Sequence, residues 1–389
     1  MLKKTFLLIT IIFLSIFFVN QFPKYFPTVY SSLASDVKKL LPKEAYVFLR
    51  LIFKNEINVK RNLNDYNVSF LPETEFINLG FNKIKINNLN INEAGYKKGS
   101  KGKYYSFFLN SYQNKILIVT ANNQIVSLDK DKLSLENPEI KELSHNLLYK
   151  TNVKGSFVYG DYLYLSYVTK LKDDCNLLNI SKAKIDLNKK LIFNKIIRFN
   201  ECAKKIQAGK IQPLIKNNSL FIVLSTAADI LQDSKQNDKK PQDDKSIFGK
   251  VLLVNETSGE YETISKGHRN SLGLYVNSDA NIILNTENGP NGGDEINRID
   301  FGNNYGWNVA SYGKKYDSNK ADYKLDHESY GFEEPIFSFV PSIGISEIIR
   351  VENNFSEQWK DNFLVGSLNS RHLFRIKFGR LSNSYIEGR

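Results

Sequence analysis

The pattern of hydrophobic and polar positions changes once along the chain. A nearly continuous apolar run covers 5–19, and 32–55 carry apolar residues at helical spacing interrupted by Pro42. From about Asp65 onward, short apolar runs closed by turn residues replace this pattern. The change in period predicts one or two N-terminal helices followed by an all-β domain over 65–389.

One short unit recurs within the β region. It consists of a polar turn, an apolar strand and a closing Ser or Thr, at intervals of about fifty to eighty residues. This spacing suits the four-stranded blades of a β-propeller, because each small sheet buries its faces only against neighbouring blades. A β-sandwich is the alternative, although it does not require the same unit so often. The copies lie at 114–120, 161–166, 218–225, 280–286 and 361–367.

Composition supports strands and argues against a nucleic-acid partner. The 26 Phe and 21 Tyr residues, with many Ile and Val, favour a β fold. The formal net charge is +12, but the positive residues are mostly lysines scattered singly rather than gathered in a stripe. We therefore expect a solvated basic surface and no nucleic-acid binding. The polar segment 229–245 is expected to be a solvated loop without chemistry.

The first residues resemble an export signal. Lys3 and Lys4 precede the apolar run, and no small-x-small cleavage site follows it. We expect 1–22 to be a signal peptide or signal anchor, with the uncleaved anchor favoured, and 23–64 to be a juxtamembrane helical segment. The predicted location is the bacterial periplasm, with the chain anchored to the inner membrane.

The two cysteines are placed for a disulfide. Cys175 and Cys202 flank two candidate strands, 178–185 and 191–199, and lie equally far from the turn near Asn188. In a regular hairpin they face each other across its open end. The sequence predicts a Cys175–Cys202 disulfide, provided that no bulge shifts the register.

Three consecutive loops hold the densest group of informative residues. They are 267–273, 286–293 and 302–307, with glycines and one proline concentrated in 288–293. Such turns can aim several carbonyl oxygens at one point, and converging carbonyl, amide and carboxylate oxygens suit Ca²⁺. The alternative is a tight turn whose Asn and Asp side chains satisfy their own backbone.

The same motifs resemble a known family. GHRN-x-x-G, ENGPNGGDEIN and NYGW, in this order, are similar to the signature of the soluble quinoprotein glucose/sorbosone (aldose sugar) dehydrogenases. The resemblance covers about 245–377 with confidence and implies a six-bladed β-propeller. In that family, the propeller holds pyrroloquinoline quinone (PQQ) and Ca²⁺ and oxidises an aldose at its anomeric carbon.

The resemblance also implies roles for individual residues. An arginine beside the quinone would polarise it and stabilise the charge that develops on reduction. For Arg269, a salt bridge to Asp294 or Glu295 is the competing interpretation. The implied PQQ contacts are Arg269, Asn270 and Arg389, the implied Ca²⁺ ligands are the carbonyls of Gly289 and Pro290, and a second Ca²⁺ site would use Ala310, Tyr312 and Glu334.

Several expected residues differ from the family pattern. The family's general base is a His, and Ile206 stands at the corresponding position, four residues before Lys210. Leu272 replaces a common Gln, and Asn369 replaces a Lys. The closing strands of the family are not matched beyond 386–389, so the last blade is expected to be incomplete.

Three interpretations of function follow from these matches and departures. The first is a PQQ-dependent sugar dehydrogenase with altered chemistry. The second is a catalytically inactive Ca²⁺-binding propeller that binds a sugar or a cell-envelope ligand. The third is a protein-interaction scaffold at the membrane. The expected partners are a sugar substrate and the membrane.

Overall fold

The structure is a computed structural model that describes most residues from 107 onward. The predicted segments 1–22 and 23–64 lie outside the described residues. In the described part, no helix is long and apolar enough to cross a membrane. The described ranges are 76–79, 82–85, 107–132, 140–148, 151–171, 175–228, 239–316, 323–352, 355, 359–369, 372–378 and 386–387.

The described residues form two compact units. The N-terminal unit consists of the described parts of 62–225 and 252–262, and the C-terminal unit consists of those of 226–251 and 263–389. Strands account for nearly all of the regular structure, with short 3-10 turns at Lys130–Lys132, Lys240–Gln242 and Glu328–Tyr330. The all-β prediction is confirmed for this part of the chain.

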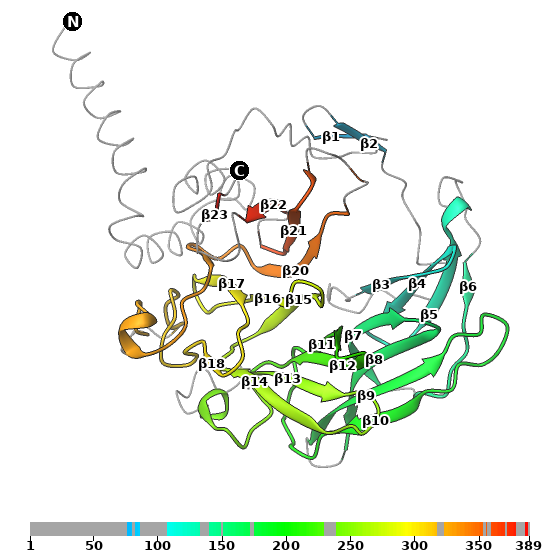
Figure 1. Ribbon diagram of the computed structural model, residues 1–389, viewed down its shortest axis with the longest axis horizontal. Coiled ribbons are helices and arrows are strands. Elements are labelled where there is room, and N and C mark those ends of the chain that lie inside the picture. Colours follow the sequence, from blue (N-terminus) through cyan, green and yellow to red (C-terminus); the bar gives the residue numbers. More distant parts are fainter. Residues whose placement is uncertain are drawn as a thin grey trace, which may run out of the picture. The chain divides into compact units, whose positions relative to one another are not determined.

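The N-terminal unit contains two four-stranded antiparallel sheets, with orders β3-β4-β5-β6 and β10-β9-β8-β7 (Figure 1). Side chains of β7 alternate between buried and more exposed positions, as expected for a half-buried strand. Leu117, Leu163 and Leu165 belong to the buried apolar cluster that these strands share. The strands are β3 (Phe107–Tyr112), β4 (Lys115–Thr120), β5 (Ile125–Asp129), β6 (Lys141–Glu142), β7 (Asn152–Tyr159), β8 (Tyr162–Lys170), β9 (Asn176–Lys184) and β10 (Asn194–Arg198).

The C-terminal unit contains two further antiparallel sheets, β15-β16-β17-β19 and β20-β21-β22-β23 (Figure 1). They share an apolar core that includes Leu284, Ile296, Ile345 and Val365. The strands are β15 (Ser271–Asn277), β16 (Ile282–Glu287), β17 (Asp294–Arg298), β19 (Phe337–Phe339), β20 (Ile345–Arg350), β21 (Asn362–Ser367), β22 (Leu373–Phe378) and β23 (Ile386–Glu387).

A fifth sheet has the order β11-β12-β13-β14-β18, and the division between the units runs through its strands β13 and β14. Its last pairing is parallel, between Ser265 and Asn303 and between Lys266 and Asn304. A separate antiparallel pair joins β1 and β2. These strands are β11 (Lys210–Lys216), β12 (Ser219–Ser225), β13 (Lys250–Asn255), β14 (Tyr261–Lys266), β18 (Asn303–Asn304), β1 (Phe76–Leu79) and β2 (Asn82–Lys85).

The blade sheets correspond to the repeated sequence unit. Each of the five copies forms the second strand, in chain order, of one sheet: β4, β8, β12, β16 and β21. The described residues therefore contain five blades of a β-propeller, where six were predicted. The five recognised repeats were the better guide to this number, because the sixth blade came from the family resemblance alone.

The predicted disulfide is present between Cys175 and Cys202, whose Cα atoms are 5.0 Å apart. They lie beside the open end of the β9–β10 hairpin, where Asn176 pairs with Ala203. The pairing contains a register shift between Lys195 and Ile197. The bulge that could have separated the cysteines therefore exists, and the disulfide forms despite it.

Candidate functional site

The three loops of the sequence signature lie together in the C-terminal unit. The first joins β14 to β15, the second joins β16 to β17, and the third follows β18. Gly293 shows why the second loop needs glycine. Its φ is +67°, and a Cβ there would lie 2.3 Å from the backbone nitrogen of Gly313.

Arg269 is buried and held by backbone carbonyls. Its side-chain Nη1 donates to the carbonyl of Asn288 at 2.7 Å and to that of Gly289 at 2.9 Å. The guanidinium carbon lies 5.3 Å from the ring centroid of Trp307, which is cation–π geometry. The carbonyl of Gly289, which was predicted as a Ca²⁺ ligand, therefore faces the guanidinium of Arg269.

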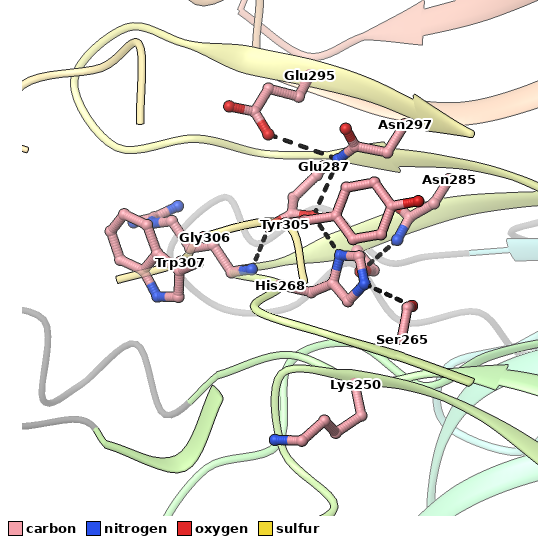
Figure 2. A network of polar contacts seen from close by, with 12 residues as sticks. Lys250, Ser265, His268, Asn285, Glu287, Glu295, Asn297, Tyr305, Gly306 and Trp307 are labelled. Carbon is pink, nitrogen blue, oxygen red and sulfur yellow. Dashed lines mark hydrogen bonds and ion pairs between the residues drawn. The ribbon is translucent and has the colours of Figure 1, made fainter. Parts of the chain in front are cut away.

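Glu287, the last residue of β16, lies at the centre of a buried hydrogen-bond network (Figure 2). Its Oε1 accepts a hydrogen bond from the backbone N–H of Arg269. Its Oε2 lies 3.0 Å from Nδ1 of His268 and 3.4 Å from Nδ2 of Asn297. The other ring nitrogen of His268 lies 2.8 Å from the hydroxyl of Ser265. His268 is completely buried, so this Ser-His-Glu arrangement supports the loop and cannot meet a substrate.

A second carboxylate lies close to the first. Glu295 is 7% exposed, and burial together with the charge of Glu287 raises its pKa well above the ordinary value of 4.5. His327 lies beyond it, with Nε2 3.8 Å from Glu295 and Nδ1 3.6 Å from Glu334. Burial lowers the pKa of His327, so this histidine favours its neutral form.

These residues line a small pocket in the C-terminal unit. Its walls include Arg269, Glu287, Glu295, Trp307 and the turn at Gly289 and Pro290. A cation, two carboxyl groups and an aromatic ring face the same space, a combination that suits a polar ligand rich in hydrogen-bonding groups.

The other predicted site residues are placed as follows. Asn270 is buried, and its carbonyl accepts from the N–H of Asn288 at 2.9 Å. Ile206 is 5% exposed and lies in the N-terminal unit. Arg389 lies outside the described residues.

The residues of the second predicted calcium site lie around one loop. Oε1 of Glu334 accepts from the backbone N–H groups of His327, at 2.6 Å, and of Glu328, at 3.0 Å. Its Oε2 accepts from the hydroxyl of Tyr312 at 2.8 Å. The carboxylate thus organises a loop, and Ala310 pairs with Lys324 nearby. Across the described ranges, no three His, Cys, Asp or Glu side chains are grouped to hold a metal ion.

Two supporting residues, Gln242 and Lys250, could not be recognised from the sequence. Gln242 lies in the segment expected to be a loop without a role, yet its Nε2 donates to the carbonyl of Trp307. Lys250 is fully buried, and its Nζ donates to the carbonyls of Lys240, Pro241 and Phe248 at 2.6, 3.1 and 3.1 Å. A lysine at the start of an otherwise apolar strand is the one signal that could have indicated such a buried ammonium.

Comparison with known proteins agrees with this geometry. The family model described as glucose/sorbosone dehydrogenase matches residues 107–385. An aldose sugar dehydrogenase of Escherichia coli is 31% identical over 119 residues, which are 31% of this chain and 32% of that protein. The quinoprotein glucose dehydrogenase B of Acinetobacter calcoaceticus is 52% identical over 73 residues, 18% of this chain and 13% of that protein. Each alignment thus spans about a third of the relative or less.

Solved structures show the same fold. The apo form of the soluble aldose sugar dehydrogenase from Escherichia coli superposes with a TM-score of 0.58 at 18% identity, covering 72% of this chain and 84% of that one. The PQQ-bound form of the aldose sugar dehydrogenase from Streptomyces coelicolor gives 0.51 at 20% identity, covering 72% and 79%. At these sequence identities, the structural similarity shows a shared fold and nothing more specific. Because the family model spans most of the chain and the signature loops form one buried site, the chain belongs to the glucose/sorbosone dehydrogenase family.

Proposed function

We propose that the pocket beside Arg269 binds PQQ with Ca²⁺ and that the protein oxidises an aldose sugar at its anomeric carbon. The observation that carries the proposal is the buried guanidinium of Arg269, fixed by two carbonyls, packed on Trp307 and exposed to the pocket. A fixed positive charge of this kind stabilises negative charge on a neighbouring group without reorganising.

The residues present fit both groups. A carbonyl oxygen has two lone pairs, so the Gly289 carbonyl that accepts from Arg269 retains one for a hard cation. Among the described residues, the buried Nε1 of Trp307, which lines the pocket, has no hydrogen-bond partner. Buried polar atoms without partners are costly, and a polar ligand would satisfy them.

When bound, PQQ would supply the acceptor for the hydride of the sugar. Arg269 holds positive charge beside the pocket, Trp307 offers an aromatic face, and the carbonyls of the Gly289–Pro290 turn would supply oxygen ligands to Ca²⁺. The sugar hydroxyl must also lose a proton, and Ile206 cannot accept one. We therefore expect turnover about a hundredfold below that of a complete site.

A second candidate function is a sugar-binding propeller without turnover. The observation that favours it is the apolar, buried Ile206 at the position expected for the base. In this case the pocket still binds a sugar, but the protein does not oxidise it.

A titration of the full-length protein with PQQ and Ca²⁺ tests the proposal. We expect saturable PQQ absorbance changes that require Ca²⁺, and slow dye reduction with aldoses. The Arg269→Gln variant should lose about 3 kcal/mol of transition-state stabilisation, which is about a hundredfold in rate. Binding of an aldose without PQQ binding or dye reduction would establish the second candidate instead.

A further inference from the structure

We infer that Glu287 is the positioning residue of this site: its carboxylate fixes the backbone of Arg269 and thereby aims the guanidinium. The inference rests on the proposed function for its catalytic consequence, but the geometry stands on the described residues alone. Figure 2 shows Glu287 reaching from the end of β16 towards His268 and Asn297.

Two loops are tied to each other by reciprocal contacts. Glu287 accepts from the backbone N–H of Arg269, and the side chain of Arg269 donates to the carbonyls of Asn288 and Gly289, directly after Glu287. The N–H of Asn288 donates back to the carbonyl of Asn270 at 2.9 Å. The guanidinium and the turn that carries the Gly289 carbonyl therefore hold each other in place, and Glu287 joins them.

Both oxygens of Glu287 face hydrogen-bond donors. The donors around Glu287 include a backbone N–H and a side-chain amide, and an ionised carboxylate has two oxygens with about four lone-pair sites to receive them. Glu287 is 4% exposed, so any donor left without it would be buried and unsatisfied.

The ring of His268 extends this support to Trp307. It stacks on Tyr305 with centroids 4.8 Å apart, and the backbone N–H of Trp307 donates to the carbonyl of Gly267 at 2.9 Å. A shift of the loop that contains Gly267 and His268 must therefore move Trp307 against Arg269. The indole consequently reports on the position of the loop even when no ligand is bound.

Two substitutions separate length from charge. Glu287→Asp keeps the charge but shortens the side chain by one methylene, so it cannot reach Arg269 and His268 together. Glu287→Gln keeps the length, and its oxygen can still accept from Arg269. Its amide would then face His268, whose ring can present Nδ1 as an acceptor while Nε2 donates to Ser265, and only the long contact from Asn297, at 3.4 Å, would lose its acceptor.

Thr286→Val is the matched control. Thr286 precedes Glu287 on β16 and points to the opposite face of the strand, where its hydroxyl donates to the carbonyl of Ser346. It is fully buried, so loss of its hydroxyl lowers stability but leaves the hydrogen bonds of Glu287 and Arg269 in place.

The experiment measures acrylamide quenching of Trp307 in the full-length protein. The chain has two tryptophans, so a Trp359→Phe background isolates the signal. We expect quenching in Glu287→Asp to rise at least threefold, while Glu287→Gln and Thr286→Val stay near the parent protein. Unchanged quenching in Glu287→Asp, or an equal rise in Thr286→Val, would overturn the inference.

With PQQ, Ca²⁺ and an aldose, kcat of Glu287→Asp should fall about a hundredfold while KM changes by less than about threefold, because misplacing a catalytic group costs about this much. Glu287→Gln should restore kcat to within about tenfold. An equal loss of kcat in both variants would contradict positioning through hydrogen bonds. If the parent protein binds no PQQ, the proposed function fails, and the quenching result still decides the role of Glu287.

Discussion

Two blades of this protein share a topology and differ in what they bury. The blade of β7 to β10 packs an apolar cluster that includes Leu163 and Leu165, and its buried polar residues, Ser166, Asn179 and Ser181, are uncharged. The blade of β15, β16, β17 and β19 buries Asn285, Glu287, Asp294, Glu295 and Asn297 beside its aliphatic residues. Each blade is a four-stranded antiparallel sheet built around one copy of the repeated unit.

The difference shows how a repeated scaffold carries a site. Buried polar groups are costly unless each finds a partner, so a blade that keeps several of them loses stability relative to an apolar one. In the site blade, these buried polar groups lie near the ends of the strands, next to the signature loops. Departures from the apolar pattern of the repeat therefore mark the functional blade.

The largest expected effect comes from equivalent positions in the two blades. Leu165 and Asn285 both precede the closing Ser or Thr of the repeat, and both are fully buried. Leu165→Asn should lower the free energy of unfolding by about 4 kcal/mol, because it removes apolar contacts and buries an amide without partners. Chemical denaturation measures this.

The control is the reverse change, Asn285→Leu. It removes one buried hydrogen bond, to Ser271 at 2.8 Å, and should cost only about 1 kcal/mol. If the two variants lose the same free energy of unfolding, the two blades tolerate a change of polarity in their interiors equally, and the comparison is wrong.

The disulfide gives the next effect. It closes a loop between residues 27 apart in the sequence, and its removal in a Cys175→Ser, Cys202→Ser double variant should cost about 3 kcal/mol. The disulfide lies in the apolar blade. Its removal should therefore leave acrylamide quenching of Trp307 at low denaturant concentration unchanged. A change in that quenching would show that the disulfide also supports the site blade.

The smallest effect is a pH dependence of the site blade. The folded state raises the pKa of Glu295 above 4.5 and so holds its proton more tightly than the unfolded state. The resulting stability is complete below pH 4.5 and is lost as the pH rises towards the folded pKa. Glu295→Gln cannot ionise, so between pH 4 and pH 7 its free energy of unfolding should fall less than that of the parent protein.

Unfolding curves of the wild type and of Glu295→Gln, recorded at pH 4 and pH 7, measure this pH dependence. Glu328→Gln, on an exposed turn, controls for the general loss of negative charge. An identical pH slope in wild type and Glu295→Gln would show that Glu295 ionises normally in the fold.

Much of the fold could be predicted from the sequence because the repeat is local. Turn, apolar strand and closing hydroxyl are consecutive residues, so each copy identified the second strand of a blade. The cysteines were predictable for the same reason. The five copies also matched the number of blades in the described residues, and the error of one blade came from the family resemblance.

The candidate site was predicted as three loops but not as a network. The sequence indicated Arg269 and the Gly289 turn but assigned no role to Glu287, because its partners lie in the loop before β15 and on β17. Salt bridges from Arg269 to Asp294 or Glu295 were the competing expectation. Asp294 instead accepts from the N–H groups of Gly289 and Ile345, at 3.1 and 2.9 Å, and so holds the turn itself.

Lys250 adds a consequence of another kind. Three carbonyl oxygens solvate its ammonium as water would, in a place that water and salt do not reach. The scattered surface lysines have potentials that dissolved ions screen within about 10 Å at 0.1 M salt. Dissolved ions cannot come between the buried charge of Lys250 and the neighbouring loop. Its electric field at that loop therefore changes little between low and high salt concentration.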